Sequence, residues 1–234
     1  MKTGAAGLAG VLGLWACLGV SGAAAQGLPA LPEEAHRVWQ AVGRVNAGGH
    51  RQRAMCSGVL VAPDRVLTAA HCLLRGDGRP VPLEDLHFVA GWHRGSAAAD
   101  SAVVEAVMHP RALREGRLDP ARDVAVLRLA EPLEIAPVPL MGRELVPAPY
   151  AIVAYQASRP HIMGGRFDCD LRLQKASLAL TACAMEPGSS GGPVMGKVDG
   201  QWRVAGVVSA RTAEWTLVAR ATDWAAGEIG GRPE

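Results

Sequence analysis

The sequence predicts an all-β protein organised as a sandwich or barrel, and two observations support this. The chain of 234 residues contains 28 glycines and 16 prolines, a turn-rich composition that does not suit a helical bundle. Short apolar segments bounded by turn residues recur along it, which favours a sandwich or barrel over a sheet of βαβ units. With 49% hydrophobic and 20% charged residues, the chain has the composition of a protein with a packed core.

Eleven strands and one helix are expected. Residues 26–37 are interpreted as a leader segment with few apolar residues to pack in a core. A first strand is expected over 38–45. Pro63 and Asp64 separate the second strand from the third. After the first, the expected strands are 58–62, 65–70, 86–90, 102–108, 124–129, 152–155, 178–181, 193–195, 202–208 and 216–220, followed by a short helix over 221–226.

The first 25 residues have the pattern of a secretory signal peptide. Lys2 supplies a positive start, residues 5–20 are free of charge, and Ala23, Ala24 and Ala25 are small residues at the expected cleavage site. A retained membrane anchor and a lipoprotein anchored through Cys17 are the alternatives. We expect cleavage after Ala25, a secreted or periplasmic protein, and no stable membrane association afterwards.

The charge balance excludes one class of partner. Lys and Arg total 24 against 22 Asp and Glu, a formal net charge of +2, and the chain contains no block of basic residues. A nucleic-acid partner is therefore not expected.

Four cysteines follow the expected signal peptide: Cys56, Cys72, Cys169 and Cys183. An even number in an exported chain predicts two disulfides, for which three connectivities exist. Four buried thiols or a zinc site are the alternatives. Zinc is disfavoured because the cysteines and histidines lack the close spacing of such sites, and no metal is expected.

Three short motifs carry the functional prediction. The first is Leu-Thr-Ala-Ala-His-Cys, which ends an apolar strand at His71 and Cys72. The second places Asp123 at the start of the segment Val-Ala-Val-Leu-Arg-Leu, and the third is Pro-Gly-Ser-Ser-Gly-Gly-Pro around Ser190. Each alone suits an ordinary structural residue. In the order His, Asp, Ser they provide a base, a carboxylate to orient it, and a nucleophile in a turn whose N–H groups could bind an oxyanion.

Taken together, these motifs resemble the chymotrypsin-like serine proteases, and the similarity covers residues 38–224. The segment Cys-Ser-Gly-Val-Leu-Val from Cys56 is similar to the family's first half-cystine segment, which bridges to the cysteine after the catalytic His. The resemblance therefore implies the pair Cys56–Cys72. The short second half is most similar to the bacterial exported glutamyl-endopeptidase-like branch, in which a cysteine often precedes the nucleophile turn; this implies Cys169–Cys183.

The resemblance also implies a fold and a mechanism. We expect two six-stranded Greek-key β-barrels, over 38–135 and 136–234, the second ending in the short helix. His71, Asp123 and Ser190 would form the triad, with the N–H groups of Gly188 and Ser190 as oxyanion hole. The expected substrate is a protein or peptide, the protein is expected to be a monomer, and no cofactor is expected.

The sequence contains other candidates for these roles and allows other functions. Ser189 also lies in the turn, but the pattern Gly-x-Ser-Gly-Gly places the nucleophile at Ser190. Asp119 precedes Pro120, and His109 occupies a position that is not catalytic in the family. A protease fold that only binds peptides is the alternative function. An esterase is disfavoured because the order Ser–Asp–His of that fold is absent.

The substrate pocket is expected to involve Ala184, Ser209 and Arg211. Ala184 stands six residues before Ser190, where trypsin-like members carry an Asp, and Glu186 is the nearest acid. Val208 stands where Glu-preferring relatives have a His. Arg211 replaces a residue that is often glycine; it could narrow the pocket or pair with an acidic side chain, and in either case it would repel basic side chains. We expect weak cleavage after Arg or Lys, with small aliphatic residues preferred modestly over acidic ones. Because Ser189 replaces the Asp that pairs with a new N-terminus in digestive members, no switch of that kind is expected.

Overall fold

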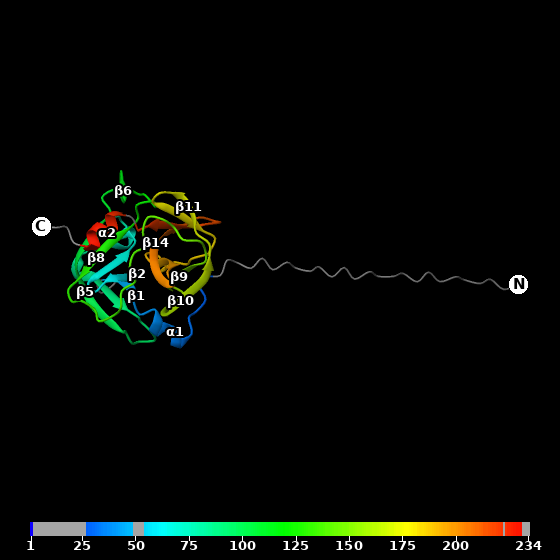
Figure 1. Cartoon of the computed structure of the whole chain (residues 1–234), viewed down its shortest axis with the longest axis horizontal. Coiled ribbons are helices and arrows are strands. Elements are labelled where there is room, and N and C mark those ends of the chain that lie inside the picture. The colour runs from blue at the N-terminus through cyan, green and yellow to red at the C-terminus, as the bar shows by residue number, and fades with distance from the viewer. Residues whose placement is uncertain (2–26, 49–53, 222, 231–234) are drawn as a thin grey trace.

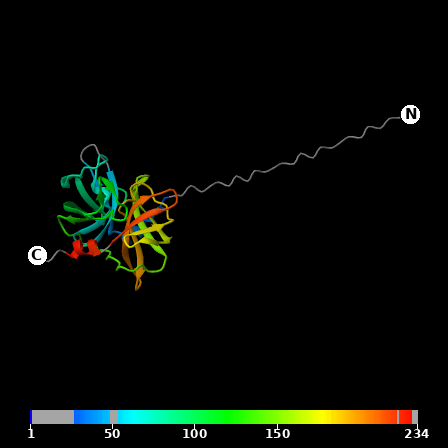
Figure 2. The ribbon, with the colours of Figure 1, turned by 90° about the horizontal axis from the view of Figure 1, so that it is seen from above.

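The computed structural model describes residues 1, 27–48, 54–221 and 223–230. The expected signal peptide and its cleavage site therefore lie outside the described residues, except for Met1. Within the described part of the chain, no helix is long and apolar enough to cross a membrane. The ribbon has two β bodies that lie side by side, one from each half of the chain (Figures 1 and 2).

The first body is a closed six-stranded antiparallel barrel, in the order β1-β2-β3-β8-β5-β4. Pairing of Val45 on β1 with Phe88 on β4 belongs to the ladder that closes it. The loop between β5 and β8 carries a small hairpin of β6 (Leu113–Arg114) and β7 (Arg117–Leu118). The barrel strands are β1 (Val42–Ala47), β2 (Ala54–Ala62), β3 (Arg65–Thr68), β4 (Leu86–Ala90), β5 (Ala99–Met108) and β8 (Ala125–Leu129).

The second body is a seven-stranded antiparallel sheet in the order β10-β9-β13-β14-β15-β12-β11. The all-β, chymotrypsin-like prediction is confirmed, but where six strands were expected here, seven pair and the first and last are not joined. The strands are β9 (Tyr150–Gln156), β10 (Arg159–Cys169), β11 (Arg172–Lys175), β12 (Leu178–Thr181), β13 (Pro193–Val198), β14 (Gln201–Arg211) and β15 (Thr216–Arg220).

Strands β10 and β11 were not expected from the sequence, for a physical reason. The ladder between β10 and β9 shifts register on both sides of a paired stretch that contains Gly164 and Gly165, so no period-two pattern runs through β10. All four residues of β11 are exposed, so it has no buried face to mark it as a strand.

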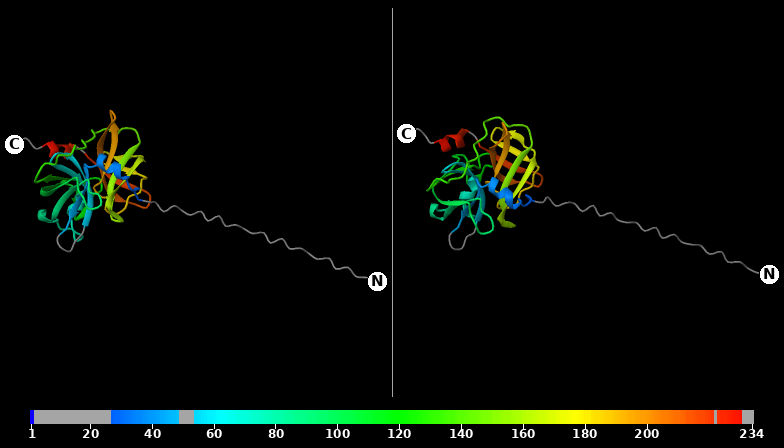
Figure 3. Two further views of the ribbon diagram at one scale, coloured as in Figure 1. Left: turned by 90° about the horizontal axis from the view of Figure 1, so that it is seen from below. Right: turned by 60° about the horizontal axis from the view of Figure 1, so that its bottom comes forward.

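The N-terminal segment differs from the expected leader. Leu28 and Leu31 are buried, and the Leu31 N–H donates to the Met163 carbonyl on β10 at 2.9 Å. A helix, α1 (Glu33–Val38), forms within the expected leader and ends at Val38, where the first strand was expected to begin; β1 begins at Val42 instead. The helix has acidic residues in its first turn and basic ones in its last, as the helix dipole favours. The segment thus packs beside the second sheet (Figure 3).

The described residues form three buried apolar clusters, of which one joins the two bodies. One fills the barrel around Leu60, Phe88 and Leu127, and another lies on the second sheet around Ile152 and Val194. The third joins both, because it combines barrel residues with residues of β9, β13 and β14. Its barrel members include Val42, Val59 and Leu67, and its sheet members include Val153, Tyr155 and Val207. The boundary between the bodies is therefore a continuous core.

The C-terminal helix α2 (Asp223–Gly230) begins two residues after the expected start and ends four residues beyond the expected end. It returns to the barrel after the second sheet is complete (Figure 2). Ala225 is buried in the shared cluster with Val124 and Val126, and the Trp224 ring lies 5.0 Å from the His109 ring.

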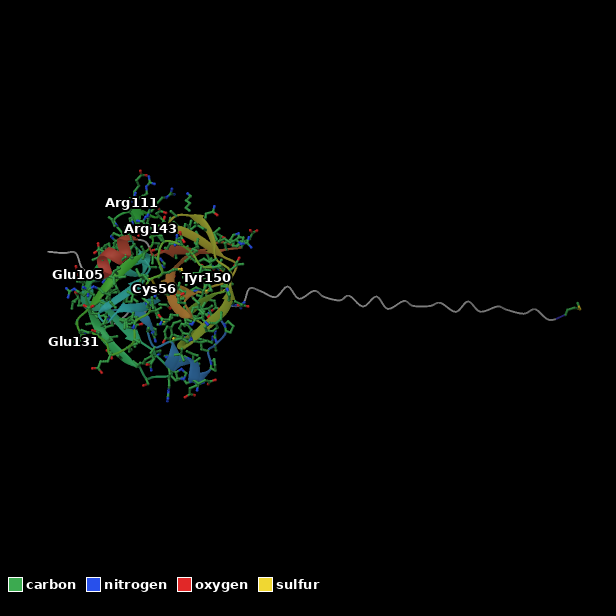
Figure 4. The ribbon with its side chains drawn as sticks, viewed as in Figure 1. Cys56, Glu105, Arg111, Glu131, Arg143 and Tyr150 are labelled. Carbon is green, nitrogen blue, oxygen red and sulfur yellow. A yellow bond between two sulfur atoms is a disulfide. The ribbon has the colours of Figure 1, made fainter. Side chains whose placement is uncertain are left out.

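Both disulfides pair as the resemblance implied. Cys56 on β2 is joined to Cys72, and Cys169 at the end of β10 is joined to Cys183 after β12. Cys56 is labelled near the centre of the molecule in Figure 4, close in projection to the boundary of the two bodies. Cys72 follows His71 directly, so the first disulfide ties the His segment to β2.

Candidate active site

His71 lies just beyond a barrel strand. Strand β3 ends at Thr68, and His71 stands in the short 3-10 helix η1 (Ala70–Leu73). Cys72 is buried and disulfide-bonded, whereas the His71 side chain keeps 30% of its surface exposed. The backbone is thus fixed while one edge of the imidazole remains open to the surface.

Asp123 is completely buried and accepts three hydrogen bonds. His71 supplies two of them, from Nδ1 to Oδ2 at 2.7 Å and from the backbone N–H to Oδ1 at 2.9 Å. The hydroxyl of Ser209, on β14 of the second sheet, donates the third to Oδ2 at 2.6 Å. A buried carboxylate needs such donors in place of water, and here both bodies provide them.

This arrangement defines the protonation of the His71 ring. A carboxylate can only accept, so the ring proton of neutral His71 lies on Nδ1, which faces Asp123. Nε2 is then left with a lone pair and can accept a proton. This is the tautomer that a general base for a neighbouring hydroxyl requires.

Ser190 lies in the glycine-rich turn between β12 and β13. Its carbonyl accepts a hydrogen bond from the Ser57 N–H on β2 at 2.7 Å. Gly191 follows with a φ of +77°, and a Cβ there would lie 2.3 Å from the Ser57 carbonyl oxygen and 2.9 Å from the Ala69 nitrogen. Glycine is therefore required for the turn to approach the segment that leads into His71.

The structure does not join Ser190 to His71 by a hydrogen bond. The Ser190 residue is half-buried, and within the described residues its hydroxyl makes no hydrogen bond. Bonds between a nucleophile and its base often form fully only when substrate is bound. The backbone contacts place Ser190 beside the His71 segment, from the opposite body.

Two N–H groups of the turn have no acceptor among the described residues: those of Gly188 and Ser190. The carbonyl that shares a peptide with each is engaged. Pro187 O accepts from the Ala157 N–H at 2.7 Å, and Ser189 O accepts from the Gly192 N–H at 2.9 Å. In a trans peptide the N–H points away from the C=O, so both N–H directions are fixed. Two fixed, unengaged donors beside a serine can stabilise an oxyanion.

Comparison with known proteins decides the family. Residues 56–207 match the model of the trypsin-like peptidase domain, which is more than half of the chain. The chain belongs to the trypsin-like peptidase family. The matched residues include the His71, Asp123 and Ser190 motifs.

Solved structures show the same fold in proteases of low sequence identity. The structure of a Glu endopeptidase in complex with MPD matches with a TM-score of 0.72 and 16% identity, covering 87% of this chain and 95% of that one. The thermostable serine protease AL20, from an extremophilic microorganism, matches with a TM-score of 0.67 and 19% identity, covering 81% of this chain and 95% of that one.

A cavity of about 400 Å³ adjoins Ser190 in this peptidase. Ser209 and Arg211, two of the predicted pocket residues, line it, whereas Ala184 does not. Ala184 lines a neighbouring cavity of about 280 Å³, which shares Met185 and Arg211 with the first. The first cavity is lined by Met185, Glu186, Pro187, Ser190, Val208, Ser209, Ala210 and Arg211.

The two charged side chains at this cavity face different neighbours. Arg211 Nη1 donates to the Met185 carbonyl at 3.3 Å, so its guanidinium reaches from β14 to the opposite wall. The Glu186 carboxylate accepts a hydrogen bond from Ser158, and its Oε1 lies 2.4 Å from the place where a Cβ on Gly27 would stand. The acid is thus directed towards the N-terminal segment.

Potential metal ligands gather at the two disulfides. Two groups of three potential ligands occur in the described residues: Cys56, His71 and Cys72, and Asp168, Cys169 and Cys183. Each group contains both sulfurs of a disulfide, which are not available as thiolate ligands.

Sequence reasoning missed two contacts at this site. Ser209 was expected only as a pocket wall, but its hydroxyl also bonds Asp123. Ser57 was quoted only as part of the half-cystine segment, yet it is completely buried and contacts the turn that carries Ser190. A serine inside a strand carries no sequence signal for such a role.

Proposed function

We propose that this trypsin-like peptidase is an exported serine endopeptidase that hydrolyses peptide bonds through an acyl-enzyme on Ser190. The observation that carries the proposal is the buried Asp123 carboxylate, bonded twice to His71, whose segment adjoins a turn with two N–H groups that have no acceptor among the described residues. A module that only bound peptides would have no need of a buried charge orienting a half-exposed imidazole.

Acylation begins with transfer of the Ser190 hydroxyl proton to His71 Nε2 as Ser190 Oγ attacks the peptide carbonyl. The carbonyl oxygen becomes an oxyanion, which the N–H groups of Gly188 and Ser190 stabilise. The C–N bond then breaks, and His71 returns its proton to the leaving amine. Water repeats the sequence on the acyl ester, with His71 again as base, and releases the acid and free Ser190.

Asp123 serves this cycle without reacting itself. Its contact with Nδ1 holds the imidazole in the productive tautomer and stabilises the imidazolium that forms in each half-reaction. Ser209 keeps the second body in contact with the same carboxylate.

The charge and size of the pocket support weak cleavage after basic residues, and we propose that small aliphatic residues are preferred modestly over acidic ones. Arg211 crosses between the walls and narrows the cavity, and its charge repels Arg and Lys. Glu186 is the acid that could attract basic side chains to the pocket. Its carboxylate accepts a hydrogen bond from Ser158 and lies close to Gly27. Cleavage of a peptide library tests this, and dominant cuts after Arg or Lys would overturn it.

Export rests on the sequence pattern of residues 1–25 and on the two disulfides, which persist in oxidising compartments. We propose that the processed protein acts on protein or peptide substrates as a monomer, without a cofactor. Mass spectrometry of the exported protein checks the cleavage after Ala25.

Peptide hydrolysis by matched serine variants tests the function. Ser190→Ala should lower kcat by about 10⁶-fold, to background. Ser189→Ala is the control: Ser189 is completely buried, its hydroxyl has no partner among the described residues, and its loss should leave kcat within about two-fold. A folded wild-type protein without turnover would support the peptide-binding alternative. Equal activity of wild type and Ser190→Ala would exclude the proposed nucleophile.

A further inference from the structure

Ser57 makes four polar contacts from a completely buried position on β2. Its N–H donates to Ser190 O, as described above, and its carbonyl accepts from the Thr68 hydroxyl at 2.8 Å. Its hydroxyl donates to Gly188 O at 2.9 Å and accepts from the Tyr155 N–H at 2.9 Å. One barrel residue therefore contacts both residues whose N–H groups are proposed to bind the oxyanion.

The direction of the Ser57 hydroxyl is determined by its partners. A hydroxyl has one proton and accepts through its lone pairs. Because the Tyr155 N–H can only donate, it occupies a lone pair of Ser57 Oγ and leaves the proton for the Gly188 carbonyl, which can only accept. The bond to Gly188 is thus specified by the backbone of β9.

Gly188 depends on such support for its conformation. It has a φ of +92° and no side chain, so its own conformational preference does not fix the two peptides that flank it. The peptide before it is held through Pro187 O by the Ala157 N–H, and the peptide after it is held through Gly188 O by Ser57. Within the described residues, Ser57 is the one side chain that bonds the backbone of residues 187–192.

We propose that Ser57 is a positioning residue of the oxyanion hole. Its hydroxyl fixes the peptide that follows Gly188, and its N–H fixes the peptide that follows Ser190, so the two residues that carry the oxyanion N–H groups are each held at their carbonyl. This inference rests on the proposed hydrolytic function. Because an oxyanion exists only after attack on the carbonyl, the Ser57 hydroxyl stabilises the transition state more than bound substrate.

Ser57→Ala tests the proposal through kinetics and inhibitor binding together. We expect kcat to fall about ten-fold with KM within about two-fold, less than the 10²–10³-fold that loss of a whole donor causes. The probe is a peptide aldehyde ending in alaninal, whose adduct with Ser190 carries the oxyanion. Its affinity should fall about ten-fold in the variant. The matching alaninol peptide forms no oxyanion and should bind wild type and variant equally.

Ser101→Ala is the matched control. Ser101 is a buried serine on β5 whose hydroxyl likewise donates to a carbonyl, that of Ala102, and accepts a backbone N–H, that of Glu131. Ser101→Ala should lower the free energy of unfolding about as much as Ser57→Ala does. It should leave the ratio of the affinities for the aldehyde and the alaninol peptide unchanged. Ser57→Thr keeps the hydroxyl and should hold that ratio near the wild-type value.

The outcomes separate this inference from the proposed function. An inactive wild type would refute the function itself. An active wild type whose affinity ratio is unchanged in Ser57→Ala, or changed equally in Ser101→Ala, would refute the role of Ser57 alone. If Ser57→Ala does not fold, Ser57→Cys fills the same space with a group that is only a weak donor, and the same ratio decides.

Discussion

The two β bodies differ in their strand pairing, since the first is a closed barrel and the second is an open sheet. In the barrel, every strand has two hydrogen-bonded neighbours, and the ladder returns from β4 to β1. The second sheet stays open, its edge strands β10 and β11 have one strand neighbour each, and its turn at residues 188–192 has two glycines with positive φ. The barrel thus holds His71 and Asp123, and the sheet holds Ser190 in a turn with two N–H groups, those of Gly188 and Ser190, that have no acceptor among the described residues.

Each body depends on the other at the site. Asp123 belongs to the barrel but takes a hydrogen bond from Ser209 of the sheet, while Ser190 belongs to the sheet but is bonded by Ser57 of the barrel. The shared apolar cluster keeps these contacts in place. Substitutions on the two sides of one contact therefore measure how much each body contributes.

The largest effect is expected at the Asp123 carboxylate. Asp123→Asn should lower kcat about 10⁴-fold, the loss seen for the same change in a member of this family, because the amide favours the wrong His71 tautomer. Ser209→Ala removes only the sheet's bond to that carboxylate and should cost about 10–10²-fold, the worth of a hydrogen bond to a charged group. Steady-state kinetics on variants with unchanged circular dichroism measure both losses of kcat. Equal losses would mean that the Ser209 hydrogen bond contributes as much to kcat as the orientation of His71 by the Asp123 carboxylate.

Stability should respond most at the point where the turn meets the barrel. Gly191→Ala should cost about 3 kcal/mol or more, because a positive φ costs about 1–2 kcal/mol and the Cβ would overlap the Ser57 carbonyl. Gly200→Ala is the control. Gly200 has a φ of +78° with open space around it, so this variant should lose only the stability that a positive φ costs an alanine. Urea unfolding gives the change in the free energy of unfolding for both variants. Similar losses would show that a Cβ at residue 191 does not overlap the barrel.

The two disulfides should have similar stability effects and different effects on activity. Cys56–Cys72 and Cys169–Cys183 have sequence separations of 16 and 14, so each should contribute about 3 kcal/mol in the chain-entropy model. Replacing the first pair by Ala frees the segment next to His71 and should also lower kcat. Replacing the second should leave the kcat of the folded protein largely intact, and a larger loss from the second pair would contradict this division.

A smaller effect concerns acid stability. Burial, with Arg122 and Arg111 nearby, lowers the pKa of His109, and its Nδ1 accepts the Arg111 N–H at 3.1 Å, which requires an unprotonated nitrogen. The unfolded chain therefore binds a proton more readily than the folded one, and stability falls as pH decreases below about 6.5. His109→Gln should weaken this decline between pH 7 and pH 5 in thermal unfolding. His36 should contribute to it in the same direction, since burial and His93 lower its pKa too.

All six barrel strands were expected, whereas β10 and β11 of the sheet were not, and the regularity of burial is the reason. Strand β4 matches its expected range because Leu86, Phe88 and Ala90 alternate with more exposed residues. The glycine-interrupted β10 and the exposed β11 carry no such pattern. The site motifs could be predicted because each lies within a few consecutive residues. The contacts of Ser57 with Gly188 and of Ser209 with Asp123 join residues 131 and 86 positions apart, and no local sequence pattern encodes them.

The central claim, that Ser190 is the nucleophile of this peptidase, is tested most directly by labelling with a fluorophosphonate probe. Mass spectrometry of the digested adduct should place the added mass on Ser190 of the wild type. Ser190→Ala should take up no label although Ser189 remains. Label on Ser189, equal labelling of both proteins, or a folded wild type that takes up no label would contradict the assignment.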